Sequence, residues 1–511
     1  MMIPLDNTPI LVAGACKTFR DVDNYHRTLV DGLDEVSRLA FDDSGRASLL
    51  RQSIDAIATI RFAMGLEPGL REQLAPEAPG AALARRWGIE HCRYYTSTDS
   101  GNVSQYLINH FADSLTRGEH RAVLIGSCEL IATVNHARKN GTDLSHWKEA
   151  TADEPVETIG PDNYGCSEME SLHGFYPPAN GFALMESAVR HQSGRSIADH
   201  QRYLGELFSR FNAVAVRNPN AWFRTPRTAV EIATATEQNR YVSFPYTKYM
   251  CAVMGVNMAA AVIMTTVGNA KRLGIPENKW VYLTGCADVD DTLYLSERPL
   301  LHDSVALWTA VDDALRMANR NITDVAHYDI YACFPAVVEI SCKTLGIDPL
   351  QRQLTVTGGL PYYGGPGSAF SLHSAVQMMS MLRQHPGASG MLIAHGWYMA
   401  KESVGIYSTT PSRAEWQRTP LANLRQRAGV SRCPINTGKV EGNGVIEACT
   451  VQFDKSGPCR GIMIGRQGNG TRFVAATHEE CSFRRMMSED MIGRHVIVSH
   501  SNGINTFTFK D

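Results

Sequence analysis

The feature that most constrains the fold is a repeated alternation of short apolar segments with amphipathic helical segments. In the first half, residues 9–14 and 121–126 are apolar runs typical of buried strands, and residues 103–115 carry Val, Leu, Ile and Phe at helical spacing. The alternation starts again in the second half, where residues 280–285 and 390–395 predict two more buried strands. Strands that alternate with helices favour an α/β fold, and their occurrence in both halves indicates a duplicated α/β core.

The same criteria predict further elements along both halves. Strands are expected at residues 94–97 and 328–335, and helices at residues 48–64, 250–266, 304–319 and 375–383. Residues from about 140 to 240 differ, because they are rich in Asn, Pro, Gly, His and Trp. We interpret them as a long loop insertion packed on the core and covering a substrate, with helices around residues 181–191 and 201–215.

The last hundred residues change character again. Five short segments alternate apolar and polar residues, and Gly-Asn-Gly at 468–470 and Ser-Asn-Gly at 501–503 are candidate hairpin turns. These segments predict a small OB-like β-barrel; they are residues 445–453, 461–466, 472–476, 495–499 and 504–509. The expected domains are therefore residues 1–249, which include the insertion, residues 250–409, and an OB-like domain over residues 410–511.

Composition limits the classes of partner. A net charge of -3 over 511 residues, with scattered basic residues, gives no field that favours nucleic acid. The longest apolar run, residues 252–267, is interrupted by Asn257 and is too short for a membrane span. The first residues lack the charged-then-apolar order of a secretory signal. We expect a cytoplasmic protein that binds neither nucleic acid nor membrane.

Cysteine and glycine patterns limit the cofactors. The 12 cysteines form no C-x-x-C pair, so reduced, mostly buried thiols are expected. The His, Cys and Asp residues show no cluster of metal-ligand spacing, and we expect no metal. The chain contains neither a Walker-type nor a dinucleotide-binding glycine pattern, which argues against ATP and NAD sites.

One segment of the second half is unusually rich in glycine. Residues 355–367 contain two Gly-Gly pairs around a Pro-Tyr-Tyr turn, and Ser-Leu-His follows at 371–373. Gly and Pro exclude an ordinary helix or central strand there. The segment therefore predicts a loop that folds closely on itself or on a ligand.

This loop, together with residues 8–14, 244–251 and 328–335, resembles signatures of the thiolase superfamily in the right order. The resemblance covers residues 8–409, and the chain looks most like bacterial acetyl-CoA acetyltransferase-type proteins that carry a C-terminal OB-like extension. It implies an αβαβα thiolase-like core and a homodimer. It also implies a coenzyme A thioester as substrate or ligand, with no covalently bound cofactor.

The resemblance places four catalytic positions, and all four depart from the Claisen pattern. Thr98 stands at the position of the nucleophilic cysteine, and Gly365 stands where the family has the histidine of Gly-His-Pro. Tyr331 replaces the residue that supports the oxyanion. The Cys-x-Gly motif falls on residues 394–396, so its cysteine corresponds to Ala394 or, with a shift of one residue, to His395.

Several residues remain as candidates for chemistry or binding. Tyrosines can donate a hydrogen bond to a developing oxyanion, and a histidine can move a proton. The candidate catalytic residues are Tyr331, His395, Thr98 and Cys333, and the candidate substrate-binding residues are Gly359, Tyr362, Tyr363, Gly364, Gly365, His373 and Tyr398. Structural roles stay open beside these: a helix cap for Thr98, an inert buried thiol for Cys333, and core packing for His373 and the tyrosine pair.

These residues lead to three alternative functions. The first is an acyl-CoA acyltransferase of the thiolase superfamily with non-standard catalytic residues. The second is a carbon–carbon lyase of the retro-aldol type that acts on a CoA ester. The third is a non-catalytic protein that binds a CoA ester, because loss of the nucleophile and its histidine is what an inactive relative would show.

Overall fold

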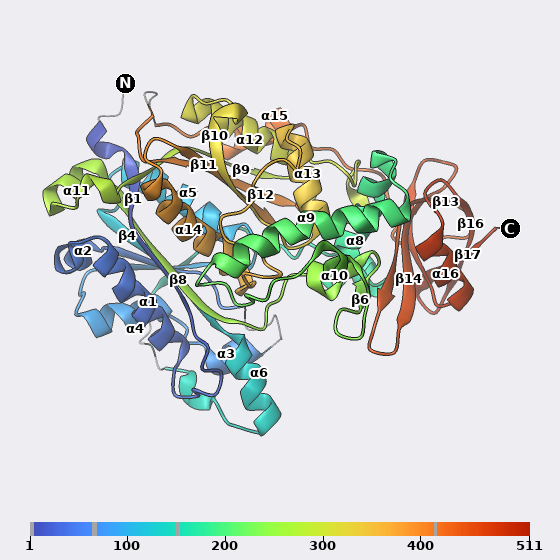
Figure 1. The fold of residues 1–511 in the computed structure, drawn as a ribbon, viewed down its shortest axis with the longest axis horizontal. Helices are drawn as coiled ribbons and strands as arrows, with labels where there is room; N and C mark the ends of the chain where they lie inside the picture. The colour runs from blue at the N-terminus through green and yellow to red at the C-terminus, as the bar shows by residue number, and fades with distance from the viewer. Residues whose placement is uncertain (1–4, 64–68, 150, 152–153, 413–415, 511) are drawn as a thin grey trace.

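A computed structural model describes residues 5–63, 69–149, 151, 154–412 and 416–510. It consists of a large layered α/β body with a smaller β-barrel at one end (Figure 1). The N-terminus lies at the far side of the body, and the C-terminus lies in the barrel. Among the described helices, none has both the length and the apolar composition required to cross a bilayer.

The body is built on one ten-stranded sheet of order β10-β11-β12-β9-β1-β8-β4-β2-β3-β5. The strands are β1 (Pro9–Thr18), β2 (Ala56–Thr59), β3 (Arg93–Ser97), β4 (Ala122–Leu130), β5 (Val156–Ile159), β8 (Asn257–Thr266), β9 (Val281–Asp290), β10 (Val325–Ile330), β11 (Ser389–Gly396) and β12 (Lys401–Ser408).

The sheet confirms the predicted duplication. The order β2-β4-β8-β1 in the first half is repeated as β10-β11-β12-β9 in the second. In each half the first pair is parallel and the next two pairs are antiparallel. The halves join where β1 pairs with β9 through Ile10–Tyr282 and Leu11–Val281.

The helices complete a layered αβαβα body. Helices α5 and α14 contact each other and strands of both halves, so they form the middle layer. Helices α1 and α4 cover the outer face of the first half, and α12 and α13 cover that of the second. The helices of the body are α1 (Leu29–Asp43), α2 (Ala47–Ser53), α3 (Leu70–Leu74), α4 (Pro79–Trp87), α5 (Val103–Thr116), α6 (Ile131–Asn140), α11 (Val267–Leu273), α12 (Val305–Ala318), α13 (Pro335–Leu345), α14 (Phe370–Gln384) and α15 (Leu421–Ala428).

The segment expected to be an insertion is largely helical. Its helices are α7 (Glu168–Leu172), α8 (Pro178–Ser193), α9 (Ile197–Arg217) and α10 (Ala229–Ala233), and the short strands β6 (Tyr241–Ser243) and β7 (Tyr246–Thr247) follow. Helices α8 and α9 pack against α13 of the body, and α8 also packs against the barrel. Buried residues of α8 therefore share one apolar cluster with both parts of the molecule.

The barrel confirms the five predicted C-terminal strands. These are β13 (Gly442–Phe453), β14 (Pro458–Arg466), β15 (Arg472–Thr477), β16 (His495–Ser501) and β17 (Ile504–Phe509), with α16 (Glu480–Ser488) before β16. The barrel closes in the order β13-β14-β15-β17-β16-β13. The predicted turn before β17 has φ of 52° at Asn502 and 80° at Gly503, as expected for a tight hairpin.

Two predicted helices are wrong. Of residues 48–63, α2 ends at Ser53 and β2 begins at Ala56, in the middle of the parallel strands. Residues 257–266 form β8, which lies between β1 and β4 and is buried on both faces. A strand buried on both faces has no polar–apolar alternation, so its Ala-rich sequence cannot be told from a buried helix by periodicity.

Candidate functional site

Residues 98–102 form the turn between β3 and α5. Thr98 is 2% exposed, and its backbone N–H donates to the Ile159 carbonyl at 3.2 Å. The residue before α5 is Asn102, so Thr98 is not the helix N-cap. The Thr98 side chain instead lines a cavity of about 30 Å³, which is large enough for a water molecule.

This cavity adjoins a wider depression of about 500 Å³. The two share Pro161, Asp290, Lys401 and Arg425 as lining residues. We call the wider depression the Lys401 groove; its other walls include Asp291, Leu293, Ala400, Val430 and Arg432. The Thr98 cavity and the Lys401 groove therefore lie next to each other and have these four residues as common walls.

Lys401 is a functional candidate that sequence reasoning missed. Its side chain lines both the cavity and the groove, the residue is 5% exposed, and Nζ donates to the Pro161 carbonyl at 3.0 Å. Burial lowers the pKa of Lys401. Lys401 is the first residue of β12 and is followed by Glu402 and Ser403, so no sequence pattern marked it.

The other motif segments meet this turn at Gly101. A Cβ at Gly101 would overlap the His395 carbonyl oxygen and would lie 2.7 Å from the Tyr331 hydroxyl. Only glycine permits so close an approach of the three segments. The segments that carry Thr98, Tyr331 and His395 thus adjoin one another, although the space at Gly101 is filled by protein atoms.

The start of α14 joins the same junction. The Ser100 N–H donates to Ser368 Oγ at 3.2 Å, and Ser104 Oγ donates to the Ser368 carbonyl at 2.8 Å. Ser371 Oγ donates to the Gly101 carbonyl at 3.4 Å. The end of the Gly-rich segment therefore contacts the Thr98 turn directly.

His395 lies on β11 with its ring fully enclosed. Its Nδ1 bonds to the Glu402 carboxylate on β12, and its Nε2 lies 3.1 Å from Ser341 Oγ on α13. Burial raises the pKa of Glu402, and the neighbouring His395 opposes that rise. Both ring nitrogens are thus engaged inside the protein, which leaves neither directed at the Thr98 cavity.

The two tyrosines of the Gly-rich loop are part of the core. Gly359 has φ of 75°, and its carbonyl accepts the N–H groups of Tyr362 and Tyr363 at 3.2 and 2.8 Å. The Tyr362 ring packs on Phe208 of α9. Burial raises the pKa of both phenols. Neither tyrosine lines the Lys401 groove.

The remaining candidates, Gly364 and Gly365 of the loop and His373 of α14, are also enclosed. Gly364 has φ of 111° and lies against Met258, and the Gly365 N–H donates to the Val253 carbonyl at 2.9 Å. His373 Nδ1 bonds to the Tyr363 hydroxyl at 3.1 Å, and burial lowers the pKa of His373 to about 3. This imidazole is therefore neutral at physiological pH.

Three candidates differ in their surroundings. Tyr331 is partly exposed, its ring packs edge-on against Phe370, and burial raises its pKa. Cys333 is buried, and burial raises its pKa, so its thiol stays protonated. Tyr398 lies apart from Thr98, because its ring contacts Phe182 of α8 and its hydroxyl donates to the Phe175 carbonyl at 2.8 Å.

The turn that carries Tyr398 is strained on both sides. Trp397 has φ of 53° and Met399 has φ of 60°, values that side chains other than glycine rarely adopt. The turn joins His395 on β11 to Lys401 on β12. Strained backbone is common at functional sites. The strain between β11 and β12 is therefore a second reason to place a functional site next to Lys401.

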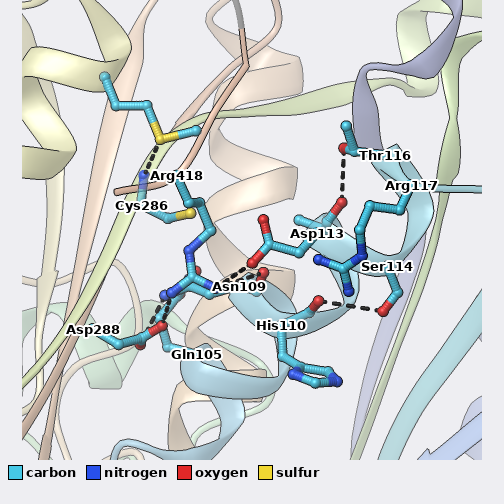
Figure 2. A network of polar contacts seen from close by, with 12 residues as sticks. Gln105, Asn109, His110, Asp113, Ser114, Thr116, Arg117, Cys286, Asp288 and Arg418 are labelled. Carbon is cyan, nitrogen blue, oxygen red and sulfur yellow. Dashed lines mark hydrogen bonds and ion pairs between the residues drawn. The ribbon is translucent and has the colours of Figure 1, made fainter. Parts of the chain in front are cut away.

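A buried polar network holds the helix that begins at this site (Figure 2). Arg418 donates to Asp113 at 2.8 Å and to the Asp288 carboxylate. Asn109 on α5 donates to Asp288 at 3.0 Å, and Gln105 donates to Asn109 at 2.8 Å. The network fixes α5 against β9 and against the segment that follows β12.

The layered duplicated body and the meeting of the motif turns at Gly101 define a protein of the thiolase superfamily. Residues 429–503 match the family described as the thiolase-like protein type 1 additional C-terminal domain. A monomeric SCP2-thiolase-like protein type 1 from Mycobacterium smegmatis has a similar crystal structure, with a TM-score of 0.84 and 30% identity over 99% of both chains. The present chain belongs to this family of SCP2-thiolase-like proteins of type 1.

More distant structures share the fold alone. The Ltp2-ChsH2(DUF35) aldolase has a TM-score of 0.58 and 14% identity, over 80% of this chain and 99% of that one. The acetyl-CoA acetyltransferase from Syntrophomonas wolfei has a TM-score of 0.55 and 13% identity, over 79% of this chain and 100% of that one. No functionally curated protein matches the sequence.

Proposed function

We propose that this protein binds an acyl-CoA or a related thioester without forming a covalent intermediate, in the Lys401 groove and with the thioester end directed at Thr98. The observation that carries the proposal is that the groove and the Thr98 cavity lie side by side and share four lining residues. The proposed ligand would extend from the groove past these residues to the position of the lost nucleophile.

The chemistry of the groove suits a phosphorylated ligand. Lys401, Arg425 and Arg432 provide three cations, against the two carboxylates of Asp290 and Asp291. Ammonium and guanidinium groups are the usual partners of phosphate oxygens. Leu293, Val430 and Pro161 offer apolar surface for the adenine and pantetheine parts of coenzyme A.

The candidate catalytic groups favour binding over Claisen chemistry. The Cys333 thiol is protonated, and burial also raises the pKa of the Tyr331 phenol. The His395 ring is held by Glu402 and Ser341. These groups can donate or accept hydrogen bonds, but none is an activated nucleophile.

Calorimetric titration with coenzyme A and acetyl-CoA tests the binding. Lys401→Met and Arg425→Ala should each weaken the affinity by about tenfold or more, since each removes a phosphate partner from the groove. Arg202→Ala is the matched control, because Arg202 is largely exposed and does not line the groove. Equal affinity in wild type and both groove variants would refute the proposed site.

A second candidate is acyl transfer through Thr98. It is favoured by Lys401, which lines the same cavity and whose lowered pKa suits a base. Thr98 Oγ1 would attack the thioester carbonyl, Lys401 would take the hydroxyl proton, and the CoA thiolate would leave and be protonated. Mass spectrometry after incubation with acetyl-CoA tests this: an acetyl mass on Thr98 that Thr98→Val abolishes supports it.

Incubation with a CoA ester also tests the remaining class of function, the carbon–carbon lyase. Release of an aldehyde or ketone from a hydroxyacyl-CoA would favour the retro-aldol lyase. Binding with neither product would favour the binding protein.

The oligomeric state and the cellular location of the protein remain predictions. The homodimer expected from the superfamily is tested by light scattering, and the related mycobacterial protein is described as monomeric. We also propose a cytoplasmic location, which fractionation of cells tests.

A further inference from the structure

Three ionisable side chains from three helices converge away from the Lys401 groove. They are Glu186 on α8, His200 on α9 and Glu339 on α13. One ligand atom from each lies within 4.8 Å of the others. The residues are 0%, 1% and 8% exposed, so water cannot satisfy their polar atoms in the usual way.

Glu186 is held by two partners. One carboxylate oxygen, Oε1, lies 2.8 Å from His200 Nε2, and the other accepts from the Tyr246 hydroxyl at 2.8 Å. Tyr246 therefore orients the carboxylate from behind while Oε1 faces the centre of the cluster. A ligating carboxylate is commonly oriented by such an outer hydrogen bond.

Glu339 is held at only one end. Its Oε2 accepts from Arg195 Nη1 at 2.8 Å. Its Oε1 has no hydrogen-bond donor among the described residues and lies 4.0 Å from His200 Nε2. This oxygen is buried and faces the Glu186 carboxyl group, so either a proton or a cation between the two would relieve their repulsion.

The residue types and their placement suit a cation. One imidazole and two carboxyl groups are a ligand set for a divalent first-row transition ion. They come from three helices, and their ligand atoms lie close enough to share one ion.

We propose that Glu186 Oε1, His200 Nε2 and Glu339 Oε1 form a structural site for such a cation, with zinc as the best match to its mixed nitrogen and oxygen ligands. No metal was expected from the sequence, because the three ligands are far apart in the chain and come together only when α8, α9 and α13 pack. The cation would tie the helical insertion to the second half of the body.

Arg195 lies between the proposed cation site and the surface. Its guanidinium lies 3.6 Å from the Tyr203 ring centroid, its side chain is 28% exposed, and with Glu339 it lines a depression of about 300 Å³. Arg195 Nη1 lies 3.1 Å from His200 Nδ1, so without a metal the ring proton sits on Nε2. When the cation binds, the proton moves to Nδ1 and Arg195 turns outward. Any proton shared by the two carboxyl groups leaves to solvent, and nothing is oxidised or reduced.

Zinc retention by the full chain tests the site. Protein stripped with a chelator and then given zinc should keep one ion per chain after gel filtration, and its melting temperature should rise with zinc but not with magnesium. Glu339→Gln and His200→Asn should weaken zinc binding by about 100-fold or more. In Glu339→Gln, the amide oxygen can still accept from Arg195.

The control is His191→Asn. His191 is an exposed histidine of α8 that pairs with Asp490 at 3.0 Å, so it reports adventitious surface binding. This variant should bind zinc as wild type does. Cobalt provides a readout that needs no variant, because ligand-field bands of an ordered site should appear at one equivalent.

Arg195→Met gives the sharpest result. Removing the donor to Nδ1 should preserve or tighten zinc binding, whereas a purely structural polar cluster would only lose stability. The proposal is overturned if wild type retains no zinc and shows no cobalt bands, or if Glu339→Gln and His200→Asn bind zinc as wild type does. The two carboxyl groups would then be held together by a shared proton alone. Coenzyme A binding is a separate measurement, so either proposal can fail without the other.

Discussion

The turn at Thr98 and the Gly-rich loop before α14 meet at Gly101, yet their surroundings differ. The Thr98 turn borders a depression lined by lysine, arginine and aspartate. The Gly-rich loop places Tyr362 and Tyr363 in the interior beside His373 of α14, and all three are almost completely enclosed. In one region polar groups remain within reach of a ligand, and in the other they have become part of the core.

The difference teaches that a glycine-rich loop is not evidence of an open site. Its glycines allow the backbone to pack against α9, where a Cβ at Gly359 would lie 2.8 Å from the Phe211 ring. Close approach of backbone to protein and close approach of backbone to ligand need the same residue type. The variants below measure how far the two regions really differ.

The largest effect on stability should come from the polar network of Arg418, which holds helix α5 next to the Thr98 turn. Arg418→Met leaves the buried carboxylate of Asp288 and the partly exposed carboxylate of Asp113 without their cation, so we expect a loss of about 3–5 kcal/mol in the free energy of unfolding. Urea denaturation measures it, with Arg202→Met as the exposed control. A loss below about 1 kcal/mol would show that other contacts hold α5.

The junction of the two regions comes next. Gly101→Ala places a methyl group on the His395 carbonyl oxygen and the Tyr331 hydroxyl, and we expect a loss of about 2–3 kcal/mol. Gly468→Ala is the matched control, since a Cβ there meets nothing within 4 Å. Equal stability of the two variants would mean that the motif turns can separate at little cost.

A pair of tyrosine variants compares the regions directly. Tyr363→Phe removes the bond to the buried His373 Nδ1, so we expect a loss of about 1–2 kcal/mol. Tyr331→Phe, at a partly exposed ring, should cost less than about 0.5 kcal/mol. The reverse order, measured by thermal unfolding, would contradict the assignment of the Gly-rich loop to the core.

The smallest effect is a pH dependence. The pKa of His373 is about 3 in the folded chain, against an ordinary value of 6.5 for an exposed histidine. Between these values the unfolded chain binds the extra proton, so stability falls as pH falls. From pH 7 to pH 6 this histidine should cost about 0.7 kcal/mol. Wild type should lose that much more than His373→Gln over the same interval. Parallel curves would show that the ring is accessible to protons.

Alternating patterns carried most of the fold prediction. The barrel strands were predictable because one face is solvated, as in β16, where Val496 and Val498 are buried and Ile497 is exposed. Strand β8 was not, since all but its last residue are buried and Ala259, Ala260 and Ala261 favour a helix when judged alone. Its position between β1 and β4 decides its conformation, and no local pattern encodes that position.

The site was predictable only where a motif marked it. The resemblance predicted that the segments of Thr98, Tyr331 and His395 lie together, and these segments meet at Gly101. Lys401 carries no motif, and its importance comes from the cavity that it lines. Which side of a loop an aromatic ring packs on depends on the helix opposite, so the burial of Tyr362 against α9 could not be inferred from neighbouring glycines.

The position of α8 has a consequence for how the molecule comes apart. Barrel side chains such as Ile462 and Val474 fill the same interior as Leu184 and Met185 of α8. The Cys449 N–H of the barrel donates to Ser187 Oγ of that helix at 3.1 Å. A barrel that shares its core with the body cannot move as an independent rigid domain. It also cannot unfold at a lower temperature than the body. In a calorimeter, body and barrel should give a single endotherm.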